Sequence, residues 1–424
     1  MKKLITILLT LSLIFAFTAC REPENDTATP PADAITAEDA EISGGAEGMR
    51  NISTMELVRD MGLGINLGNT LEATGSWIRG TMVMQYEMAW GSPIITEDII
   101  KGYADAGFGA MRIPVAWSNL MYEGEIINTQ TLVIKKDFII SDELLERVEE
   151  IVQWVLGNGM YAIVNIHWDG GWWEGFAEED YSEAMLRFTR FWEQISEHFK
   201  DYDDKLLFES ANEELGWHSI WNPWSGSNDE KEISYRIVNE VNQKFVDVVR
   251  ASGGNNAYRH LLIAGYHTNI DWTCDPLFIM PADPVNRLAI KVHYYEPFGF
   301  THLEHDQSWA NARWDWGTDA DYRQLERELD KMVESFYSKG IPVVIGEYGM
   351  AKEVSEEEMR MYTLAVTEAM FVRGFAPMLW CVQRNAGRGE MLFYFDRYSI
   401  GIVDPELEAG MKEIAKMERA PIVN

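Results

Sequence analysis

The chain has 424 residues, of which 46% are hydrophobic and 12% aromatic, so it can bury a large core. Its formal net charge at pH 7 is −32. A chain this acidic repels nucleic acid and anionic membrane surfaces, so we expect no nucleic-acid partner.

Residues 1–20 have the pattern of a secretory signal, because the basic Met1–Lys3 precedes an almost wholly apolar run, Leu4–Ala19. The small residues before Cys20 resemble a bacterial lipobox, in which the cysteine is lipidated after cleavage. Ordinary signal cleavage near Ala19 is the alternative. We expect a lipoprotein-type signal peptide, and an extracellular protein anchored to the bacterial cell membrane only through a lipid on Cys20.

Residues 21–49 are rich in Ala, Glu, Asp, Thr and Pro and have almost no large apolar side chains. Such a segment cannot bury enough surface to fold, so we predict a disordered acidic tether followed by one domain over residues 50–424. If Cys20 is lipidated, only Cys274 and Cys381 remain, which is too few for a disulfide framework. Cys381 lies in an apolar run and is expected to be a buried thiol.

Eight short apolar runs follow the tether. Most are nearly continuous in apolar residues, as strands covered on both faces should be. They are Leu63–Gly68, Gly109–Val115, Tyr161–Trp168, Leu206–Glu213, Leu261–Tyr266, Leu288–Tyr295, Ile341–Glu347 and Ala376–Val382.

Amphipathic segments with helix start and stop signals lie between these runs. The segment 141–159 begins at a Ser/Asp cap and ends at glycine, and 355–374 opens with a capping box from Ser355 to Glu358. Similar patterns cover 182–199 and 321–340. Strands and helices that alternate eight times predict an α/β fold, a (β/α)8 TIM barrel with a single catalytic domain. A doubly wound open sheet is the alternative.

The active site of such a barrel forms at the carboxyl ends of the strands. The last polar residues of the runs are therefore the site candidates: Asn69, Arg112, His167, Asn212, Glu213, His293, Tyr295, Glu347 and Trp380. No Ser/His/Asp order, His-Glu-x-x-His or paired Cys-x-x-Cys motif occurs. His167 and His293 have no obvious third ligand, so we expect neither a metal nor a cofactor.

Two of the candidates, Glu213 and Glu347, are carboxylates on the fourth and seventh predicted strands. This arrangement suits retaining glycoside hydrolysis, which needs a protonated acid and an ionised nucleophile about 5 Å apart. A nearby arginine would keep the nucleophile charged, whereas an apolar, acid-rich environment would raise the pKa of the other carboxyl.

Seven motifs connect the chain to a known family: "GINLGNTLEA", "GFGAMRIPVAW", "AIVNIHWDGGWW", "FESANE", "VHYYEPFGFT", "PVVIGEYG" and "MLW". They occur in family order from about Met55 to Pro405. The chain resembles glycoside hydrolase family 5, and it is similar to the subfamily of bacterial endo-β-1,4-glucanases with members active on xyloglucan and mixed-linkage glucan.

The resemblance implies a monomeric endo-acting hydrolase of β-1,4-glucan backbones that works by double displacement. Glu213 would be the acid/base, Glu347 the nucleophile, Arg112 a support for the nucleophile and Asn212 a ligand of the sugar 2-hydroxyl. The other implied substrate-binding residues are His167, His293, Tyr295 and Trp380. Activity on β-mannan or xylan is an alternative, and a non-catalytic glycan-binding protein is a third reading.

Three departures from the family pattern bear on substrate preference more than on the reaction. Glu214 stands where the family usually has proline after the acid, and Trp168 replaces a second histidine. The segment 381–390, "CVQRNAGRGE", replaces an acidic stretch.

The run "LLFESANEEL" holds three glutamates. If the strand continues, Glu209 and Glu213 share a face, with Glu209 about 13 Å deeper at the usual rise per residue. Glu209 is then a buried partner for polar groups such as Arg112, and Glu214 is a bystander. In the loops after the third and fourth predicted strands, we expect sugar contact for some of Trp172, Trp173, Trp217, Trp221 and Trp224.

Overall fold

Eight parallel strands close into a barrel in the computed structural model, which describes residues 48–123, 125–128, 133–383 and 392–423. The strands are β1 (Gly64–Asn66), β2 (Ala110–Ile113), β7 (Tyr161–Asn165), β8 (Leu206–Glu209), β9 (Leu261–Ala264), β10 (Leu288–Tyr294), β11 (Val343–Tyr348) and β12 (Ala376–Leu379). Their order around the barrel is β1-β12-β11-β10-β9-β8-β7-β2. The predicted (β/α)8 fold is confirmed, and each of the eight apolar runs coincides with one barrel strand, although β11 ends one residue beyond its run.

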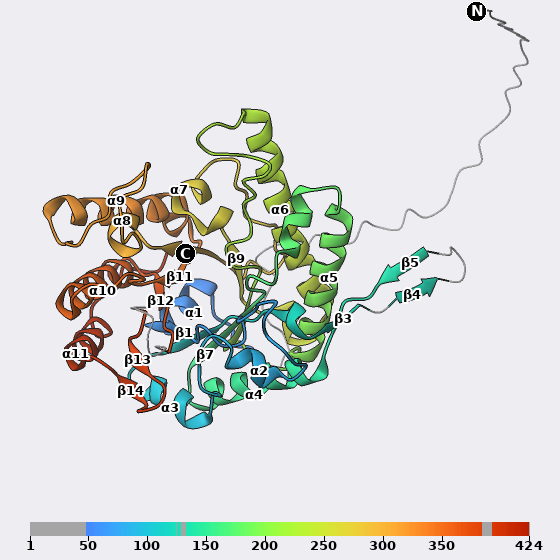
Figure 1. Ribbon diagram of the computed structural model, residues 1–424, viewed down its shortest axis with the longest axis horizontal. Coiled ribbons are helices and arrows are strands. Elements are labelled where there is room, and N and C mark those ends of the chain that lie inside the picture. Colours follow the sequence, from blue (N-terminus) through green and yellow to red (C-terminus); the bar gives the residue numbers. More distant parts are fainter. Residues whose placement is uncertain (1–47, 124, 129–132, 384–391, 424) are drawn as a thin grey trace, which may run out of the picture. The chain divides into compact units, whose positions relative to one another are not determined.

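Helices surround these strands (Figure 1). They are α1 (Thr54–Asp60), α2 (Val83–Glu87), α3 (Glu97–Asp105), α4 (Asp142–Gly157), α5 (Tyr181–His198), α6 (Asn228–Ala251), α7 (Ile270–Thr273), α8 (Phe298–Thr301), α9 (Asp319–Ser335), α10 (Glu356–Val372) and α11 (Pro405–Ile414). None of the helices in the described ranges is both long and apolar enough to cross a membrane.

Short elements decorate the loops. The two-stranded sheets pair β3 (Met121–Tyr122) with β6 (Ile139–Ile140), β4 (Glu125–Asn128) with β5 (Val133–Lys136), and β13 (Phe395–Asp396) with β14 (Gly401–Ile402). Single 3-10 turns are η1 (Trp117–Leu120), η2 (Trp172–Ala177), η3 (Gly254–Ala257), η4 (Tyr266–Thr268) and η5 (Tyr337–Lys339).

The four predicted helical segments correspond to α4, α5, α9 and α10. The predicted starts of α5 and α9 are wrong, because α5 begins after Asp180, which makes no side-chain capping bond, and Thr318 caps α9. Ser141 caps α4 by accepting a hydrogen bond from the backbone N–H of Leu144. The capping box predicted for α10 is wrong in one half. Ser355 accepts from the backbone N–H of Glu358, but the Glu358 side chain does not complete the box at the Ser355 backbone N–H.

Several predictions concern residues outside the described ranges. These are the signal peptide and Cys20, the tether up to residue 47, and residues 384–390 of the unusual segment after the eighth strand. Within the described residues, Cys274 and Cys381 are free thiols, and Cys381 is buried as expected.

The barrel interior is layered. Apolar side chains from alternate strand positions fill the amino-terminal half, where Ala110, Leu207 and Val344 pack with residues of α1. Successive inward positions are two residues apart along a strand. The next inward layer toward the carboxyl ends is polar and fully buried, and it consists of Asn66, Arg112, Asn165, Glu209 and Lys291. This polar layer is the floor of the site.

Candidate active site

Arg112 holds the floor together with all five of its N–H groups, although its side chain is 0% exposed. Nε and Nη2 donate to the two carboxylate oxygens of Glu209 at 2.8 and 2.7 Å. Nη2 also donates to Asn212 Oδ1 at 2.9 Å. Nη1 donates to Glu347 Oε1 at 2.7 Å and to Asn66 Oδ1 at 3.0 Å. One guanidinium therefore joins Glu209 to Glu347.

Glu209 is a buried ionic partner, as predicted from the sequence. Besides Arg112, its Oε1 lies 3.1 Å from Lys291 Nζ and accepts from Asn165 Nδ2 at 3.1 Å. Burial opposes ionisation, yet the charges of Arg112 and Lys291 lower the pKa of Glu209 to about 2. This carboxylate stays charged and is not accessible to a substrate.

The prediction that Glu209 and Glu213 share a strand face is wrong, because β8 ends at Glu209. The period of two holds only inside a strand, and residues 210–215 are irregular. This segment has no strand hydrogen bonds to fix its backbone. Lys291 Nζ instead donates to the carbonyl oxygens of Ala211 and Asn212, at 3.1 and 3.0 Å.

His267 holds the other half of the same segment. Its Nδ1–H donates to the carbonyl oxygen of Glu213 at 2.7 Å, and its backbone N–H donates to the carbonyl of Leu215. His267 and Thr268 have φ angles of 48° and 47°, a left-handed conformation that few non-glycine residues adopt. Non-local hydrogen bonds, and not strand register, therefore place Glu213.

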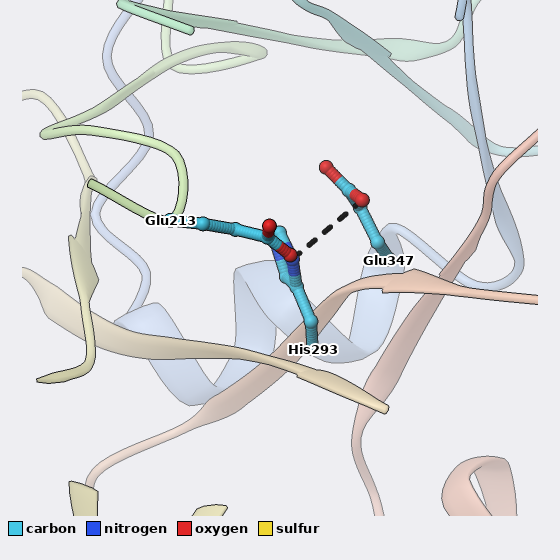
Figure 2. A group of neighbouring side chains, drawn as sticks. All are labelled: Glu213, His293 and Glu347. Atoms are coloured by element: carbon cyan, nitrogen blue, oxygen red, sulfur yellow. Dashed lines mark hydrogen bonds and ion pairs between the residues drawn. The ribbon is translucent and has the colours of Figure 1, made fainter. Parts of the chain in front are cut away.

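Glu213 and Glu347 lie close together, and His293 of β10 lies near both carboxyl groups (Figure 2). One carboxylate oxygen of each glutamate and a ring nitrogen of His293 lie within 4.8 Å of one another. His293 Nδ1 is 2.7 Å from Glu213 Oε1 and 3.6 Å from Glu347 Oε2. The Tyr295 hydroxyl donates to the same Oε2 at 3.0 Å. Two carboxyl groups at this spacing can act on opposite sides of one bond.

His293 is neutral with a defined tautomer. Burial lowers its pKa well below the usual value, and the charge of Lys291 adds to this effect. Lys291 Nζ lies 3.3 Å from Nε2 and has only protons to offer, so Nε2 accepts. The remaining ring proton is on Nδ1, which donates it to Glu213.

The two carboxyl groups of the pair have different partners. Burial raises the pKa of Glu347 to about 7; Arg112 opposes the rise and the charge of Glu213 adds to it. Desolvation also raises the pKa of Glu213, whose side chain is 43% exposed. Like charges this close resist double ionisation, so the pair carries one charge near neutral pH. The donors Arg112 and Tyr295 hold that charge on Glu347.

The pair opens into a pocket of about 430 Å³. The pocket is lined by Glu72, Trp90, His167, Trp168, Gly171, Trp173, Glu174, Asn212, Glu213, Glu214, Gly216, His267 and Trp380. Four predicted site residues, His167, Asn212, Glu213 and Trp380, thus line the pocket. The other four, Arg112, His293, Tyr295 and Glu347, do not line it but bond to these residues or to each other. Asn69 does not line it. A larger groove of about 750 Å³ along α6 contains none of the predicted site residues.

Trp380 and His167 form one side of the pocket, with their rings stacked at 5.7 Å and an interplanar angle of 18°. Gly68 allows the indole to approach, because a Cβ at this position would lie 2.9 Å from the Trp380 ring. Only 9% of Trp380 is exposed, and the residue lines the pocket.

The loop tryptophans mostly pack against the protein. Trp173, Trp217 and Trp221 are buried. Trp172 stacks on Trp173 at a centroid distance of 4.4 Å. Trp224 is 80% exposed and Trp168, in the pocket wall, is 47% exposed. Of the five tryptophans expected to include sugar contacts, Trp224 is therefore the exposed one and Trp173 is the one that lines the pocket. Trp168 was not among the five.

Glu213, His293 and Glu347 also have the spacing of a metal site, with one possible ligand atom each. Their present partners are donors and cations, since Arg112 binds Glu347 and Lys291 binds His293. Two buried positive charges beside the group oppose a further cation, so the geometry favours proton transfer over metal binding.

Sequence reasoning missed several contributors. Lys291 had a readable signal: it interrupts an apolar run two residues before His293, and a buried lysine needs partners. Asn66 and Asn165 interrupt their runs in the same way. His267 had no such signal, because its bond to Glu213 joins residues 54 positions apart.

An eight-stranded barrel that holds two facing carboxyl groups at the carboxyl ends of its strands defines a class, the barrel glycoside hydrolases. A family model described as "Cellulase (glycosyl hydrolase family 5)" matches residues 71–386. The chain belongs to this family, and it is a glycoside hydrolase of the endoglucanase type.

Relatives and solved structures agree with this assignment. The chain is 32% identical over 377 residues to a xyloglucan-specific endo-β-1,4-glucanase of Bacteroides ovatus, with 85% of this chain and 70% of the relative covered. It is 32% identical over 380 residues to endoglucanase A of Ruminococcus albus, covering 89% and 94%. The structure of a family 5 lichenase from Caldicellulosiruptor sp. F32 superposes with a TM-score of 0.76 at 30% identity, covering 89% of this chain and 99% of that one. A subfamily 4 broad-specificity endoglucanase from Ruminococcus champanellensis with bound cellotriose gives 0.73 at 29%, covering 86% and 99%.

Proposed function

We propose that the protein hydrolyses the backbone of β-1,4-glucans with retention of anomeric configuration. The observation that carries the proposal is the spacing of the pair: carboxylate oxygens of Glu213 and Glu347 lie within 4.8 Å. Retaining enzymes hold their carboxyl groups about 5–5.5 Å apart, whereas inverting enzymes separate them by about 6.5–9.5 Å to admit a water. The gap here suits direct attack by a carboxylate.

In the first half-reaction, Glu347 attacks the anomeric carbon while Glu213 gives its proton to the glycosidic oxygen. The carbon–oxygen bond breaks, the leaving chain departs with a free hydroxyl, and a glycosyl ester of Glu347 remains. In the second, ionised Glu213 takes a proton from water as that water attacks the same carbon and releases Glu347. Two inversions give net retention.

The surrounding residues support each protonation state. Arg112 and Tyr295 donate to Glu347 and stabilise its charge before attack. His293 donates to Glu213 through Nδ1 and orients it toward the bond to be broken. Arg112 occupies Oδ1 of Asn212, which leaves Nδ2 as the donor for the sugar 2-hydroxyl.

We propose cellulose-type, mixed-linkage and xyloglucan backbones as the substrates. The names of the relatives support this range, since they include a xyloglucan-specific enzyme, a lichenase and a broad-specificity endoglucanase. The stacked pair Trp380 and His167 offers a flat apolar face for a sugar ring. Reducing-sugar release from xyloglucan, mixed-linkage glucan, carboxymethylcellulose, β-mannan and xylan distinguishes the proposal from the mannanase and xylanase alternatives.

Replacement of the nucleophile tests the mechanism. We expect Glu347→Gln to lower kcat on soluble mixed-linkage glucan by roughly a thousandfold or more, because no covalent intermediate forms. Glu179→Gln, at an exposed position, is the matched control and should match the wild type. Proton NMR of wild-type products should show the β anomer first. Full activity of Glu347→Gln, or an initial α anomer, would overturn the mechanism, and binding without products would indicate a glycan-binding protein.

A further inference from the structure

Glu214 was expected to be a bystander, but it lines the pocket beside Glu213. Its Oε2 is buried and has no hydrogen-bond partner. Leaving a buried oxygen unpaired is costly, so such an atom in a native protein calls for a hydrogen-bond donor. The expectation failed because it extended a strand that ends at Glu209.

Trp173, in contrast, has a buried hydrogen-bond donor without an acceptor. Its side chain is 1% exposed and lines the same pocket, and its indole Nε1–H is buried without an acceptor. Of the described side chains with a buried unpartnered polar atom, Trp173 and Glu214 are the two that line this pocket. One is a pure donor, and the other is a carboxyl oxygen.

The two residues come from neighbouring loops. Trp173 is in η2, which follows β7, and Glu214 follows β8; these strands are paired in the barrel. Trp217 Nε1 donates to the carbonyl oxygen of Trp173 at 3.1 Å and so ties the two loops together. The unpartnered atoms therefore belong to one connected wall.

We propose that Glu214 and the indole N–H of Trp173 form a subsite that binds hydroxyl groups of the glucan chain next to the bond that is cleaved. A sugar hydroxyl both donates and accepts, so it can give its proton to Glu214 and accept one from Trp173. The subsite rests on the proposed function, and it specifies which groups outside the catalytic pair select the substrate. The usual proline of the family at position 214 has no side-chain polar atom, so this contact is a feature of the present chain.

The protonation of Glu214 is compatible with this role. Burial raises its pKa to about 8, and the adjacent charge of Glu213 adds to the rise, although its own backbone N–H, Lys291 and Asn212 oppose it. At neutral pH the carboxyl is mostly uncharged. It can then act as donor or acceptor without placing a second negative charge beside Glu213.

Steady-state kinetics on cellotetraose and soluble mixed-linkage glucan test the subsite. We expect Glu214→Ala and Trp173→Phe each to raise KM by roughly three- to tenfold, the effect of one lost hydrogen bond, with kcat within about twofold. Glu214→Gln keeps a neutral polar group and should stay within twofold of the wild-type KM. Glu179→Ala, which removes an exposed carboxylate, is the charge-matched control.

The double variant shows whether both residues bind the same hydroxyl. If they do, Glu214→Ala combined with Trp173→Phe raises KM by less than the product of the two single effects. An unchanged KM in Glu214→Ala, or a loss confined to kcat, would overturn the subsite while wild-type activity still supported the proposed function. A wild type without activity on any glucan would instead overturn the proposed function. Thermal melts identify a misfolded Trp173→Phe, in which case the two Glu214 variants decide.

Discussion

Arg112 satisfies four acceptor side chains at once, and a residue with fewer donors cannot replace it. Arg112→Met would leave the buried carboxylate of Glu209 with Lys291 as its remaining cationic partner. We expect this variant to lower the free energy of unfolding by about 3–5 kcal/mol, the usual cost of breaking a buried ion pair. Urea denaturation measures the change.

A second substitution separates charge from packing. Arg112→Met combined with Glu209→Gln removes the uncompensated charge, so it should recover part of the lost stability. Activity should remain low in both variants, because Glu347 has lost its guanidinium partner. If Arg112→Met alone were as stable as the wild type, the ion pair between Arg112 and Glu209 would contribute nothing to the free energy of unfolding.

The direction of a site side chain could be predicted from the sequence where the residue lies inside a strand. Arg112 and His293 lie in strands, and their inward direction follows from the period of two. Glu347 also lies in a strand, but the register of β11 shifts between Ile345 and Tyr348, so the period alone does not give its direction. Glu214 was not predictable in this way. Its direction depends on hydrogen bonds from Lys291 and His267 to the segment after β8, and no local pattern specifies such bonds.

At the level of elements, the segment after β8 depends on the loop that follows β9. His267 links them through its ring bond to the carbonyl of Glu213. We expect His267→Ala to lower kcat by roughly tenfold with little change in KM, since a lost hydrogen bond of this kind displaces the acid/base without removing a sugar contact. Steady-state kinetics at several pH values measure the effect.

His267→Asn is the matched control, because asparagine tolerates the left-handed φ and keeps a donor. It should retain more activity than His267→Ala. Equal losses in both variants would show that the ring itself, and not its hydrogen bond, is required.

The strands and major helices were predictable because their signals are local: buried apolar runs, Ser or Thr caps and terminal glycines. The residues at which strands end were harder to predict from the sequence. The run Leu206–Glu213 is apolar only at its start, and the structure ends β8 four residues before the run does. Residues 210–213 form a loop that is held by Lys291 of β10 and by His267, which follows β9. The sequence alone does not distinguish this loop from a continuation of β8.

Across the whole molecule, several buried carboxyl groups hold protons above their usual range. Burial raises the pKa of Asp169 to about 6, that of Glu72 to about 7 and that of Glu214 to about 8. Between pH 6.5 and 8 the folded protein therefore binds more protons than the unfolded chain, so the free energy of unfolding falls as the pH rises. Below about pH 6.5 the sign reverses for histidines such as His167 and His293, which burial keeps neutral.

We therefore expect Tm to be highest near pH 6.5 and to fall toward pH 8. Thermal melts at constant ionic strength measure it. In Glu214→Gln the fall between pH 6.5 and 8 should be smaller, because one of the responsible groups is gone. A Tm that rises steadily from pH 6.5 to 8 would contradict the assignment.

The location of the protein stays a proposal. We propose that it is a membrane-anchored lipoprotein, on the basis of the signal pattern and the small residues before Cys20. Labelled palmitate should enter the wild type and not Cys20→Ala, and globomycin should block processing. Incorporation into both proteins would place the lipid elsewhere, and incorporation into neither would favour ordinary cleavage near Ala19.

The pocket wall carries four carboxyl groups, those of Glu72, Glu174, Glu213 and Glu214, and its described lining contains no lysine or arginine. The two nearby cations, Arg112 and Lys291, are fully buried in contacts within the protein. A polysaccharide that bears uronic acids or carboxymethyl groups would meet the charge on Glu347 and the formal net charge of −32, with no compensating cation in this lining. The protein should therefore discriminate among polymers by charge as well as by linkage, turning over neutral glucans faster than acidic ones by a margin that narrows as salt is added.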